Sequence, residues 1–493
     1  MTKTIRSTTT VPTGVTKNLL PITKSEYLIY LACSPEFWYC KHCPEDNFCA
    51  PDVEALHIMR QGNAIDCLAR DYFQASDALH VELQCNFQSD RLLARADIIL
   101  TEIGTGTKTL IEVKSGTEVK SEYIDDLAFQ VIAAEAVGVH VHRIGVLHVN
   151  SAYVYTGEMD IQSFFVFADV TDTVGSRIPS TRENIEAAIL YLHQDEPVMH
   201  LHQYCGQKLA CPALRRHHPH LPEYSVFNIS RIGQPKLREL LTNGMVDILQ
   251  VPRTFTLSDK QRLQVDVVQS GRPHICHRSI QEALDSLQFP IYFLDYETSQ
   301  YGIPSYTGIR PYQQMVFQWS LHVIHTADHE PEHFDFLSDG SDHPARQFAH
   351  ALQAAIPLDG GSVLVWNKSF EMTRNKELGE MYPEYEPFFA DVNARVYDLM
   401  EIFQKQHYVH PGFKGSCSIK HILPVLAPQL SYSDLEINHG MLASIRWFEL
   451  VTGVTPESEK ERVLGNLRQY CQLDTLAMVE VYKHLRTITD FGD

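Results

Sequence analysis

The side chains in this sequence that could bind a metal or act in catalysis lie in two groups of acidic residues at short, regular spacing. In LLARADIIL, Asp97 lies in an apolar run that predicts a strand, and IEVKS later places Glu112 and Lys114 two residues apart. Alternate residues of a strand project from one face, so pairing of the two strands in a hairpin would bring all three together. Carboxylates are the hard oxygen ligands that Mg²⁺ prefers, and an adjacent lysine can stabilise developing charge. A Glu-x-Lys triplet also arises by chance on exposed strands, but burying carboxylates without a partner is costly.

The second group combines a strand with helices. Asp295 and Glu297 in IYFLDYETS are two apart on one strand face, and Glu371 in SVLVWNKSFEM begins a helix. Tyr470 and Asp474 are four apart and share one face of a helix. Together these acids could hold two metal ions about 4 Å apart for phosphodiester hydrolysis, with the tyrosine hydroxyl positioning or helping to deprotonate the water. The alternative is a charged strand edge beside an ordinary amphipathic helix.

The elements that must position these residues form two α/β domains, because strands alternate with helices in both halves of the chain. We expect a flexible tail over residues 1–21, an α/β domain over 22–225, a small helical connector over 226–288 and a second α/β domain over 289–493. Apolar spacing predicts helices near 22–40, 55–73, 123–137, 183–192 and 464–485, and strands near 81–87, 92–100, 108–115, 144–149, 163–170, 291–298 and 315–324.

Charge and composition limit the function classes. The chain has 493 residues, and its 41 Lys and Arg against 61 Asp and Glu leave a net charge of −20, which is not typical of a nucleic-acid-binding protein. At 44% hydrophobic residues the composition is that of an ordinary globular protein. No apolar run approaches the length of a membrane-spanning helix, and no signal-peptide-like segment follows the basic N-terminus. We therefore expect a cytoplasmic protein without a membrane partner.

The first group of residues resembles the PD-(D/E)XK nuclease superfamily, and more narrowly its RecB-like branch. Asp97 matches the first acidic residue, Glu112 and Lys114 match the Glu-x-Lys motif, and Gln130 in DDLAFQVIAAEAVG matches the helical glutamine of the branch. The resemblance implies a restriction-endonuclease-like core that binds Mg²⁺ or Mn²⁺ through Asp97 and Glu112. Asp66 stands where many relatives have histidine, and could be a further ligand or only a polar residue on a helix.

The second group resembles the DEDD exonucleases of the RNase H-like fold, in the subgroup with a tyrosine four residues before the last aspartate. Asp295, Glu297 and Asp474 match directly, and Tyr470 is that tyrosine. The middle motif expects aspartate where Glu371 stands, so the carboxylate is one methylene longer. That difference could move the second metal by about an ångström and weaken catalysis.

The order of the two modules, with the stretches GFKGSCSIKHILPVL and YSDLEINHGMLA, makes residues 22–490 resemble an uncharacterised bacterial family that joins the two domain types. The resemblance implies a metal-dependent nuclease that hydrolyses phosphodiester bonds, acting on DNA rather than RNA and on single strands or ends. Two alternatives stay open. One domain could be catalytic while the other grips nucleic acid, or the whole chain could be a non-catalytic nucleic-acid-binding scaffold.

The chain has eleven cysteines, and they allow three interpretations. Some RecB-like nucleases carry an iron–sulfur cluster on one cysteine before the nuclease core and three after it. That resemblance implies a [4Fe–4S] cluster or Zn²⁺ on Cys33, Cys205, Cys211 and His217. A local alternative is a Zn²⁺ site on Cys33, Cys40, Cys43 and Cys49, which contain a CxxC pair. The third interpretation is reduced cysteines without a metal.

Overall fold

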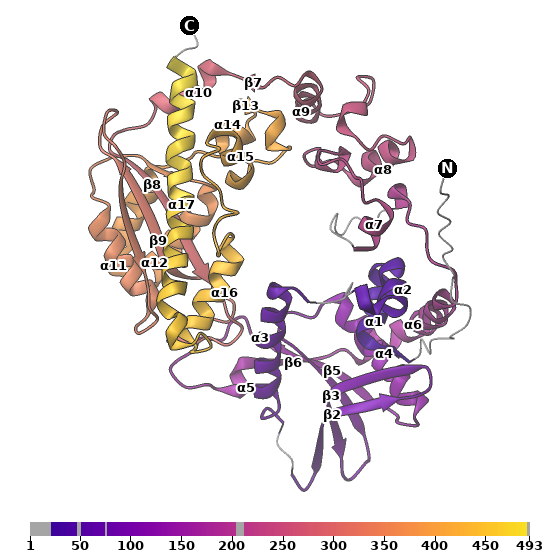
Figure 1. Ribbon diagram of the computed structural model, residues 1–493. Coiled ribbons are helices and arrows are strands. Elements are labelled where there is room, and N and C mark those ends of the chain that lie inside the picture. The colour runs from indigo at the N-terminus through magenta and orange to yellow at the C-terminus, as the bar shows by residue number, and fades with distance from the viewer. Residues whose placement is uncertain (1–20, 47–50, 74–75, 204–211, 491–493) are drawn as a thin grey trace, which may run out of the picture. The chain divides into compact units, whose positions relative to one another are not determined.

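The structure is a computed structural model that describes residues 21–46, 51–73, 76–203 and 212–490 of a mixed α/β protein (Figure 1). The chain divides into two compact units, which we describe separately. The first comprises residues 1–50, 64–149 and 161–219, and the second comprises residues 51–63, 150–160 and 220–493. The segment predicted as a connector, 226–288, lies in the second unit. All but one residue of the predicted tail lie outside the described residues.

A mixed six-stranded sheet forms the centre of the first unit. Its strands run in the order β1-β3-β4-β5-β6, and β2 also pairs with β3. The predicted hairpin is present, because β3 and β4 are antiparallel and Gly106 in their turn has a positive φ of 71°. The strands are β1 (Ile22–Thr23), β2 (Leu79–Gln88), β3 (Leu92–Glu102), β4 (Lys108–Lys114), β5 (Arg143–Val149) and β6 (Phe165–Asp169).

The helices of the first unit pack around α4 (Ser121–Ala136), most of which is buried. The single helix predicted over 22–40 is two helices in the structure. The chain breaks at Cys33 because Pro35, in the first turn of the second helix, has no amide hydrogen to continue the first. The remaining helices are α1 (Lys24–Ala32), α2 (Ser34–His42), α5 (Ile161–Phe164), α6 (Thr171–Leu192) and α7 (Pro212–His217); α3 (Val53–Ala69) is divided between the units.

A mixed five-stranded sheet forms the centre of the second unit, with β8 as its middle strand. β8 is antiparallel to β9 and parallel to β11. The order is β10-β9-β8-β11-β12, with β8 (Ile291–Ser299), β9 (Met315–Ile324), β10 (Glu332–Leu337), β11 (Val363–Val365) and β12 (Val396–Asp398); β7 (His274–Ile275) and β13 (Tyr408–Val409) form a separate ribbon.

Helices cover both faces of this sheet (Figure 1). The long C-terminal helix α17 (Glu457–Asp490) crosses one face and begins earlier than the 464–485 predicted. The other helices are α8 (Gln234–Thr242), α9 (Asp259–Ser270), α10 (His277–Asp285), α11 (Pro344–Ala355), α12 (Lys368–Met381), α13 (Glu386–Ala394), α14 (Glu401–Gln404), α15 (Ile419–Leu426) and α16 (Gly440–Val451). Among the described residues, no helix combines the length and the apolar character needed to cross a bilayer.

The alternation of side chains along β8 decides which residues face α17. Tyr296 points to the opposite face, where its hydroxyl donates to Asn375 Oδ1 of α12 at 2.9 Å and its ring lies edge-on to Phe348 of α11. Asp295 and Glu297 therefore both project toward α17, since residues two apart share a face. Burial of both faces explains why the strand is apolar from Ile291 to Leu294, before these acids begin.

A layer of buried polar side chains joins β9 to α17. Gln318 donates to the Leu467 carbonyl at 2.9 Å, and the hydroxyls of Ser320 and Thr475 lie 2.7 Å apart. Nδ1 of His322 lies 2.8 Å from the same Thr475 hydroxyl. Because each buried polar atom needs its partner, these contacts fix the rotation and the height of α17 over the sheet.

We predict that His322 makes the second unit acid-sensitive. Burial, reinforced by the positive charges of His333 and Lys483, lowers the pKa of His322 from 6.5 to about 4. The unfolded chain therefore binds the proton more tightly than the folded chain. The free energy of unfolding is unaffected by this group above pH 6.5 and decreases as the pH falls toward 4, by up to about 3 kcal/mol.

The measurement is urea denaturation followed by tryptophan fluorescence at pH 7.5 and pH 4.5. His322→Asn, which keeps a polar atom near Thr475, should lose less stability between the two pH values than the wild type. The exposed His350→Asn should behave as the wild type does. Equal losses in all three proteins would contradict the prediction.

Candidate functional sites

The predicted residues of the first unit lie together at the β3–β4 hairpin. Asp97 Oδ2 on β3 accepts a hydrogen bond from the Val113 amide at 2.8 Å. Glu112 Oε1 on β4 accepts from the Lys114 ammonium at 2.7 Å. The spacing of two residues thus places Glu112 and Lys114 on one face, as the sequence predicts.

Helices α4 and α1 add two charged residues that sequence analysis missed. Gln130 Nε2 donates to Glu112 Oε2 at 2.6 Å and to Asp126 Oδ1 at 2.9 Å. Lys24 donates to Glu112 Oε1 at 2.8 Å, and Lys114 also donates to Asp126 Oδ2 at 2.8 Å. Both oxygens of Glu112 therefore have protein donors. Asp126 could have been noticed, because it is four residues before Gln130 on the same helix face.

The two predicted carboxylates of this unit have opposite pKa shifts. Burial, and then the negative charge of Glu112, raises the pKa of Asp97 to about 7. Burial alone would raise the pKa of Glu112 as well, but the ammonium groups of Lys114 and Lys24 outweigh it and lower that pKa to about 2. The negative charge of Glu112 is therefore balanced by nearby ammonium groups, whereas that of Asp97 is poorly balanced by its neighbours.

Asp66, for which the sequence allowed two roles, lies on α3 within the first unit. The Gln84 amide bridges it to the site, 3.4 Å from Asp66 Oδ2 and 3.5 Å from Asp97 Oδ1. Asp66 also pairs with Arg70 at 2.9 Å. The negative charge of Asp66 contributes to the raised pKa of Asp97. Asp66 is thus close enough to act on the site and already has a cationic partner.

Four predicted carboxylates converge in the second unit. Asp295 and Glu297 come from β8, Glu371 from the first turn of α12 and Asp474 from the middle of α17. Burial raises the pKa of Asp295 well above its ordinary value, and the negative charges of Asp474, Glu297 and Glu371 raise it further. Four carboxylates close enough to repel one another in a buried place are an unstable arrangement without a cation.

Three residues outside the predicted acidic set partly compensate this repulsion. The Tyr432 hydroxyl donates to Asp474 Oδ1 at 2.6 Å. The Lys420 ammonium lies 5.3 Å from the ring centres of both Tyr432 and Tyr470, and its charge opposes the effect of burial on the pKa of Glu297. The Cys471 Sγ lies 3.8 Å from Asp295 Oδ2. Lys420 and Tyr432 lie in the two stretches that carry the family resemblance, and the sequence also indicates Lys420 as a basic residue near the motifs that could contact phosphate.

Tyr470 remains a hydroxyl group at this site. Burial, followed by the negative charges of Asp474, Glu297 and Asp295, raises the pKa of Tyr470 above its ordinary value. A protonated phenol can donate a hydrogen bond to a carboxylate or to a water. Burial raises the pKa of Asp474 to about 6, and a hydrogen bond from Tyr470 offsets part of that rise.

Glu371 is held in place by the helix that carries it. Asp398 accepts hydrogen bonds from the amides of Asn367 and Lys368, both at 3.1 Å, and so caps the start of α12. Glu371 Oε2 is buried and has no hydrogen-bond partner among the described residues. Burial raises the pKa of Glu371 to about 8.

The donor set of the second unit fits a divalent cation. Among the described residues, one group of three ligand-type side chains has its ligand atoms within 4.8 Å of one another, namely Asp295, Glu297 and Cys471. Oxygen ligands with excess negative charge suit Mg²⁺ or Mn²⁺, and the Glu371 oxygen, which has no hydrogen-bond partner among the described residues, is of the same ligand type.

The predicted cysteine and histidine ligands are only partly described. Cys33 is buried between α1 and α2, and Cys40 and Cys43 lie at the end of α2. His217 ends α7, and its Nε2 lies 2.5 Å from the Tyr39 hydroxyl. The other predicted ligands, Cys49, Cys205 and Cys211, lie outside the described residues. The cluster therefore stays a prediction. Cys40 is disulfide-bonded in the structure, which argues against the local Zn²⁺ site and against a fully reduced set of cysteines.

Comparison with known proteins points to a family without an assigned function. Residues 292–418 match a domain of unknown function, DUF2779, and this range includes Asp295, Glu297 and Glu371. A stretch of 145 residues is 31% identical to the uncharacterized protein UU173 of Ureaplasma parvum, over 26% of this chain and 21% of that protein. A stretch of 211 residues is 25% identical to the uncharacterized protein MG366 homolog of Mycoplasma pneumoniae, over 39% of this chain and 31% of that protein. The matches span about a fifth to a third of these curated relatives. No solved structure matches the chain.

We predict that Lys24 stabilises the first unit through Glu112. Lys24→Met leaves the buried carboxylates Glu112 and Asp126 with Lys114 as their only ammonium partner, and should cost about 2 kcal/mol. The change should cost much less in a Glu112→Gln background, because the charge that Lys24 neutralises is absent there. Chemical denaturation of the four proteins of this cycle gives the coupling energy. Lys120→Met, on an exposed residue, is the control, and additive effects in the cycle would contradict the prediction.

We predict that the second site destabilises the protein unless a cation is bound. In EDTA at pH 8, Asp295→Asn should raise the melting temperature by an amount equivalent to about 1–2 kcal/mol, because it removes one of four buried acids that oppose one another's ionisation. Mn²⁺ should raise the melting temperature of the wild type, and the variant should lose most of that increase. The exposed Asp328→Asn should respond to Mn²⁺ as the wild type does. A variant that is less stable than the wild type in EDTA, and is equally stabilised by Mn²⁺, would refute this account.

Proposed function

We propose that this protein is a metal-dependent nuclease that hydrolyses phosphodiester bonds of DNA, single-stranded or at ends, with two separate nuclease-type sites. In this proposal the first unit is a RecB-like PD-(D/E)XK domain and the second an RNase H-like DEDD exonuclease-type domain. The observation that carries it is the convergence of Asp295, Glu297, Glu371 and Asp474 beside Tyr470, with the charge repulsion evident in the raised pKa of Asp295. A central β8 strand with helices on both sheet faces agrees with the expected fold.

Mg²⁺ or Mn²⁺ would be held by the four carboxylates of the second site, and by Asp97 and Glu112 in the first. When bound, such an ion acts as a Lewis acid on a phosphoryl oxygen and lowers the pKa of a bound water. Asp295 and Glu297 are fixed by the β8 backbone, and Glu371 by the capped start of α12. Asp474 is oriented by the Tyr432 hydroxyl.

The remaining groups of the second site have roles that follow from their protonation states. Tyr470, as a neutral phenol, donates a hydrogen bond and orients the attacking water. Lys420 places a positive charge next to the acids without making an ion pair with any described carboxylate, and can approach a phosphate oxygen. Lys114 has the corresponding place in the first site, where it contacts Glu112.

A second candidate is that only the second unit is catalytic while the first grips nucleic acid. Oε1 of Glu112 accepts hydrogen bonds from Lys24 and Lys114, and Oε2 accepts one from Gln130, so a cation that binds this carboxylate competes with donors already in place. In the second unit, by contrast, Glu371 Oε2 has no described partner to displace. This difference favours unequal contributions from the two sites.

We predict that purified protein with Mg²⁺ or Mn²⁺ cleaves labelled single-stranded DNA, and that Asp295→Asn and Lys114→Ala remove separable parts of the activity. Loss of a group that stabilises the transition state costs about a hundredfold or more at the site concerned. Partial loss in each variant, with complete loss in the double variant, indicates two active sites. Complete loss in Asp295→Asn alone assigns catalysis to the second unit. Double-stranded DNA and RNA in parallel define the substrate. Equal residual cleavage in the wild type and all variants would refute the proposal.

A further inference from the structure

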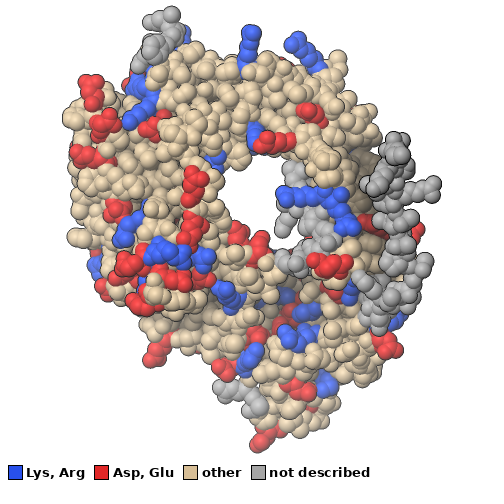
Figure 2. All heavy atoms as spheres, viewed as in Figure 1, with Lys and Arg blue, Asp and Glu red and all other residues tan. Residues whose placement is uncertain are grey.

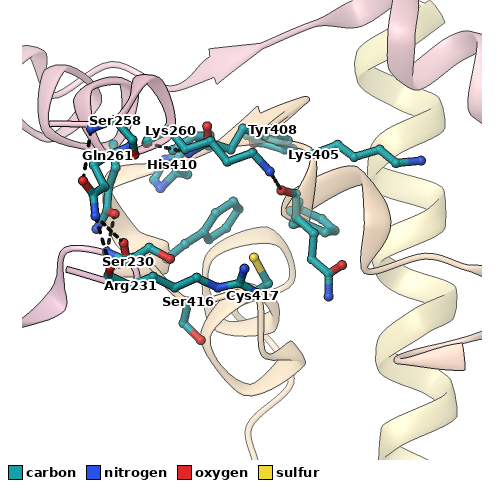
Figure 3. Close-up of a pocket in the computed structure, with 17 residues that line it drawn as sticks. Ser230, Arg231, Ser258, Lys260, Gln261, Lys405, Tyr408, His410, Ser416 and Cys417 are labelled. Carbon is teal, nitrogen blue, oxygen red and sulfur yellow. Dashed lines mark hydrogen bonds between the residues drawn. The ribbon is translucent and has the colours of Figure 1, made fainter. Parts of the chain in front are cut away.

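A cavity of about 600 Å³ lies within the second unit, well separated in sequence from the acids of the second site (Figure 3). Its lining comes from α9, from the segment Ser230–Arg231 and from residues 403–417. Phe403, Tyr408 and Phe413 are buried and form an apolar part of its lining. The size is ample for a ligand as large as a nucleotide.

The charge of the lining differs from that of the chain. Arg231, Lys260 and Lys405 line the cavity, and no aspartate or glutamate is among its lining residues. Over the rest of the second unit acidic and basic side chains are interspersed on the face shown in Figure 2. Lys405 pairs with Glu401 at 2.5 Å, whereas Arg231 and Lys260 make no ion pair with a described carboxylate. A cavity without acids, in a chain of net charge −20, is suited to an anion.

The position of Arg231 is fixed by buried glutamines. Its backbone has a positive φ of 52°, which is unfavourable for a residue other than glycine and persists only where the surroundings impose it. Gln261 donates to the carbonyls of Ser230 and Arg231 at 3.1 and 3.3 Å, and Gln264 Oε1 accepts from the Ser230 amide at 2.9 Å. Strain of this kind is concentrated at functional positions, and here it holds the exposed guanidinium of Arg231 at the cavity.

The opposite side of the cavity is equally well defined. The Lys260 ammonium donates to the Gln404 carbonyl at 2.9 Å, and the Gln406 amide donates to the Lys260 carbonyl at 2.8 Å. Figure 3 shows Lys260 on the side of Tyr408 and His410, and Arg231 across the cavity beside Cys417. Two accessible cations therefore flank one space, with serine hydroxyls and glutamine amides between them.

The cavity and the acidic site share a structural element. Trp366 donates from its indole to the carbonyl of Cys417 at 3.1 Å, and its ring lies 5.6 Å from that of Phe403, so it packs behind the cavity lining. The next residue, Asn367, is the N-cap of α12, whose first turn holds Glu371. Two lining residues of the cavity, Phe403 and Cys417, thus contact the residue that precedes the N-cap of the helix carrying Glu371.

We infer that this cavity binds a nucleotide unit through its phosphate, with Arg231 and Lys260 as the phosphate contacts and the polar and aromatic lining around the sugar and base. A guanidinium suits phosphate because it donates two parallel hydrogen bonds. A single-stranded nucleic acid and a free nucleotide share this chemistry. The strand is the source we favour, and that choice, unlike the site itself, rests on the proposed function.

The test measures binding in EDTA, so that cleavage plays no part. Fluorescence anisotropy with a short labelled oligodeoxythymidine gives strand affinity, and calorimetry with thymidine monophosphate gives free-nucleotide affinity. We expect Arg231→Asn, which tolerates the positive φ, and Lys260→Gln each to weaken binding about tenfold, the loss expected for one charged hydrogen bond. In the double variant the salt dependence of strand binding should be shallower by about 1.4, since each lost phosphate contact removes about 0.7 from the slope.

Arg238→Gln, on an exposed arginine of α8 in the same unit, removes one positive charge away from the cavity and should bind as the wild type does. Loss of oligonucleotide binding in the cavity variants assigns the site to the strand. Loss of thymidine monophosphate binding alone assigns it to a free nucleotide. Binding of both probes that is unchanged in the cavity variants, or is absent in the wild type, overturns the inference. Nucleotide binding without cleavage in Mg²⁺ would refute the proposed function alone, and cleavage with unaltered binding in the variants would refute this inference alone.

Discussion

The repulsion among buried carboxylates at the junction of β8, α12 and α17 is the constraint on which the second unit depends. Each acid loses most of its hydration, and the pKa of Asp295 rises both from burial and from three neighbouring negative charges. No folded chain keeps such a group unless surrounding contacts hold it. The surrounding contacts are those of the polar layer under α17, the Asp398 cap of α12 and the bond from Tyr432 to Asp474. The favourable free energy of folding of the sheet and its helices thus offsets the unfavourable burial of these acids.

In the first unit, lysine side chains reduce the repulsion among the buried carboxylates. Its acids lie equally deep, but Lys24 and Lys114 bring two ammonium groups within 2.8 Å of Glu112, and the pKa of that carboxylate falls to about 2. Asp97 has only a backbone amide and a distant glutamine, and its pKa rises to about 7. A cation entering this site exchanges protein partners, whereas one entering the second site relieves repulsion. The two sites therefore differ in how much a bound cation would stabilise them, although their acidic pairs look similar in the sequence.

Local spacing explains which parts of the fold and the sites the sequence could predict. The pairs Glu112 and Lys114, and Tyr470 and Asp474, are found because two residues on a strand and four on a helix share a face whatever the tertiary structure. The sequence also contains the hairpin turn at Gly106, which the structure has. The break between α1 and α2 was missed because the apolar spacing continues through Ser34 and Pro35, and the backbone chemistry of proline there outweighs the spacing.

The site contacts that the sequence did not predict join residues far apart in the chain. Lys24 is 88 residues from the Glu112 it contacts, and Tyr432 is 42 residues from Asp474, so no local pattern joins either pair. The cavity is a further case, because its lining joins residues 230–264 to residues 403–417, and the hydrogen bonds of two glutamines hold Ser230 and Arg231 in place.

The distribution of charge also depends on the fold. A net charge of −20 argues against a nucleic-acid partner only if the charge is spread evenly, and it is not. No acid is among the described residues that line the cavity, so an anion meets the local field of Arg231 and Lys260 within a Debye length of about 8–10 Å. At that range the distribution of charge, which only the fold determines, outweighs its sum.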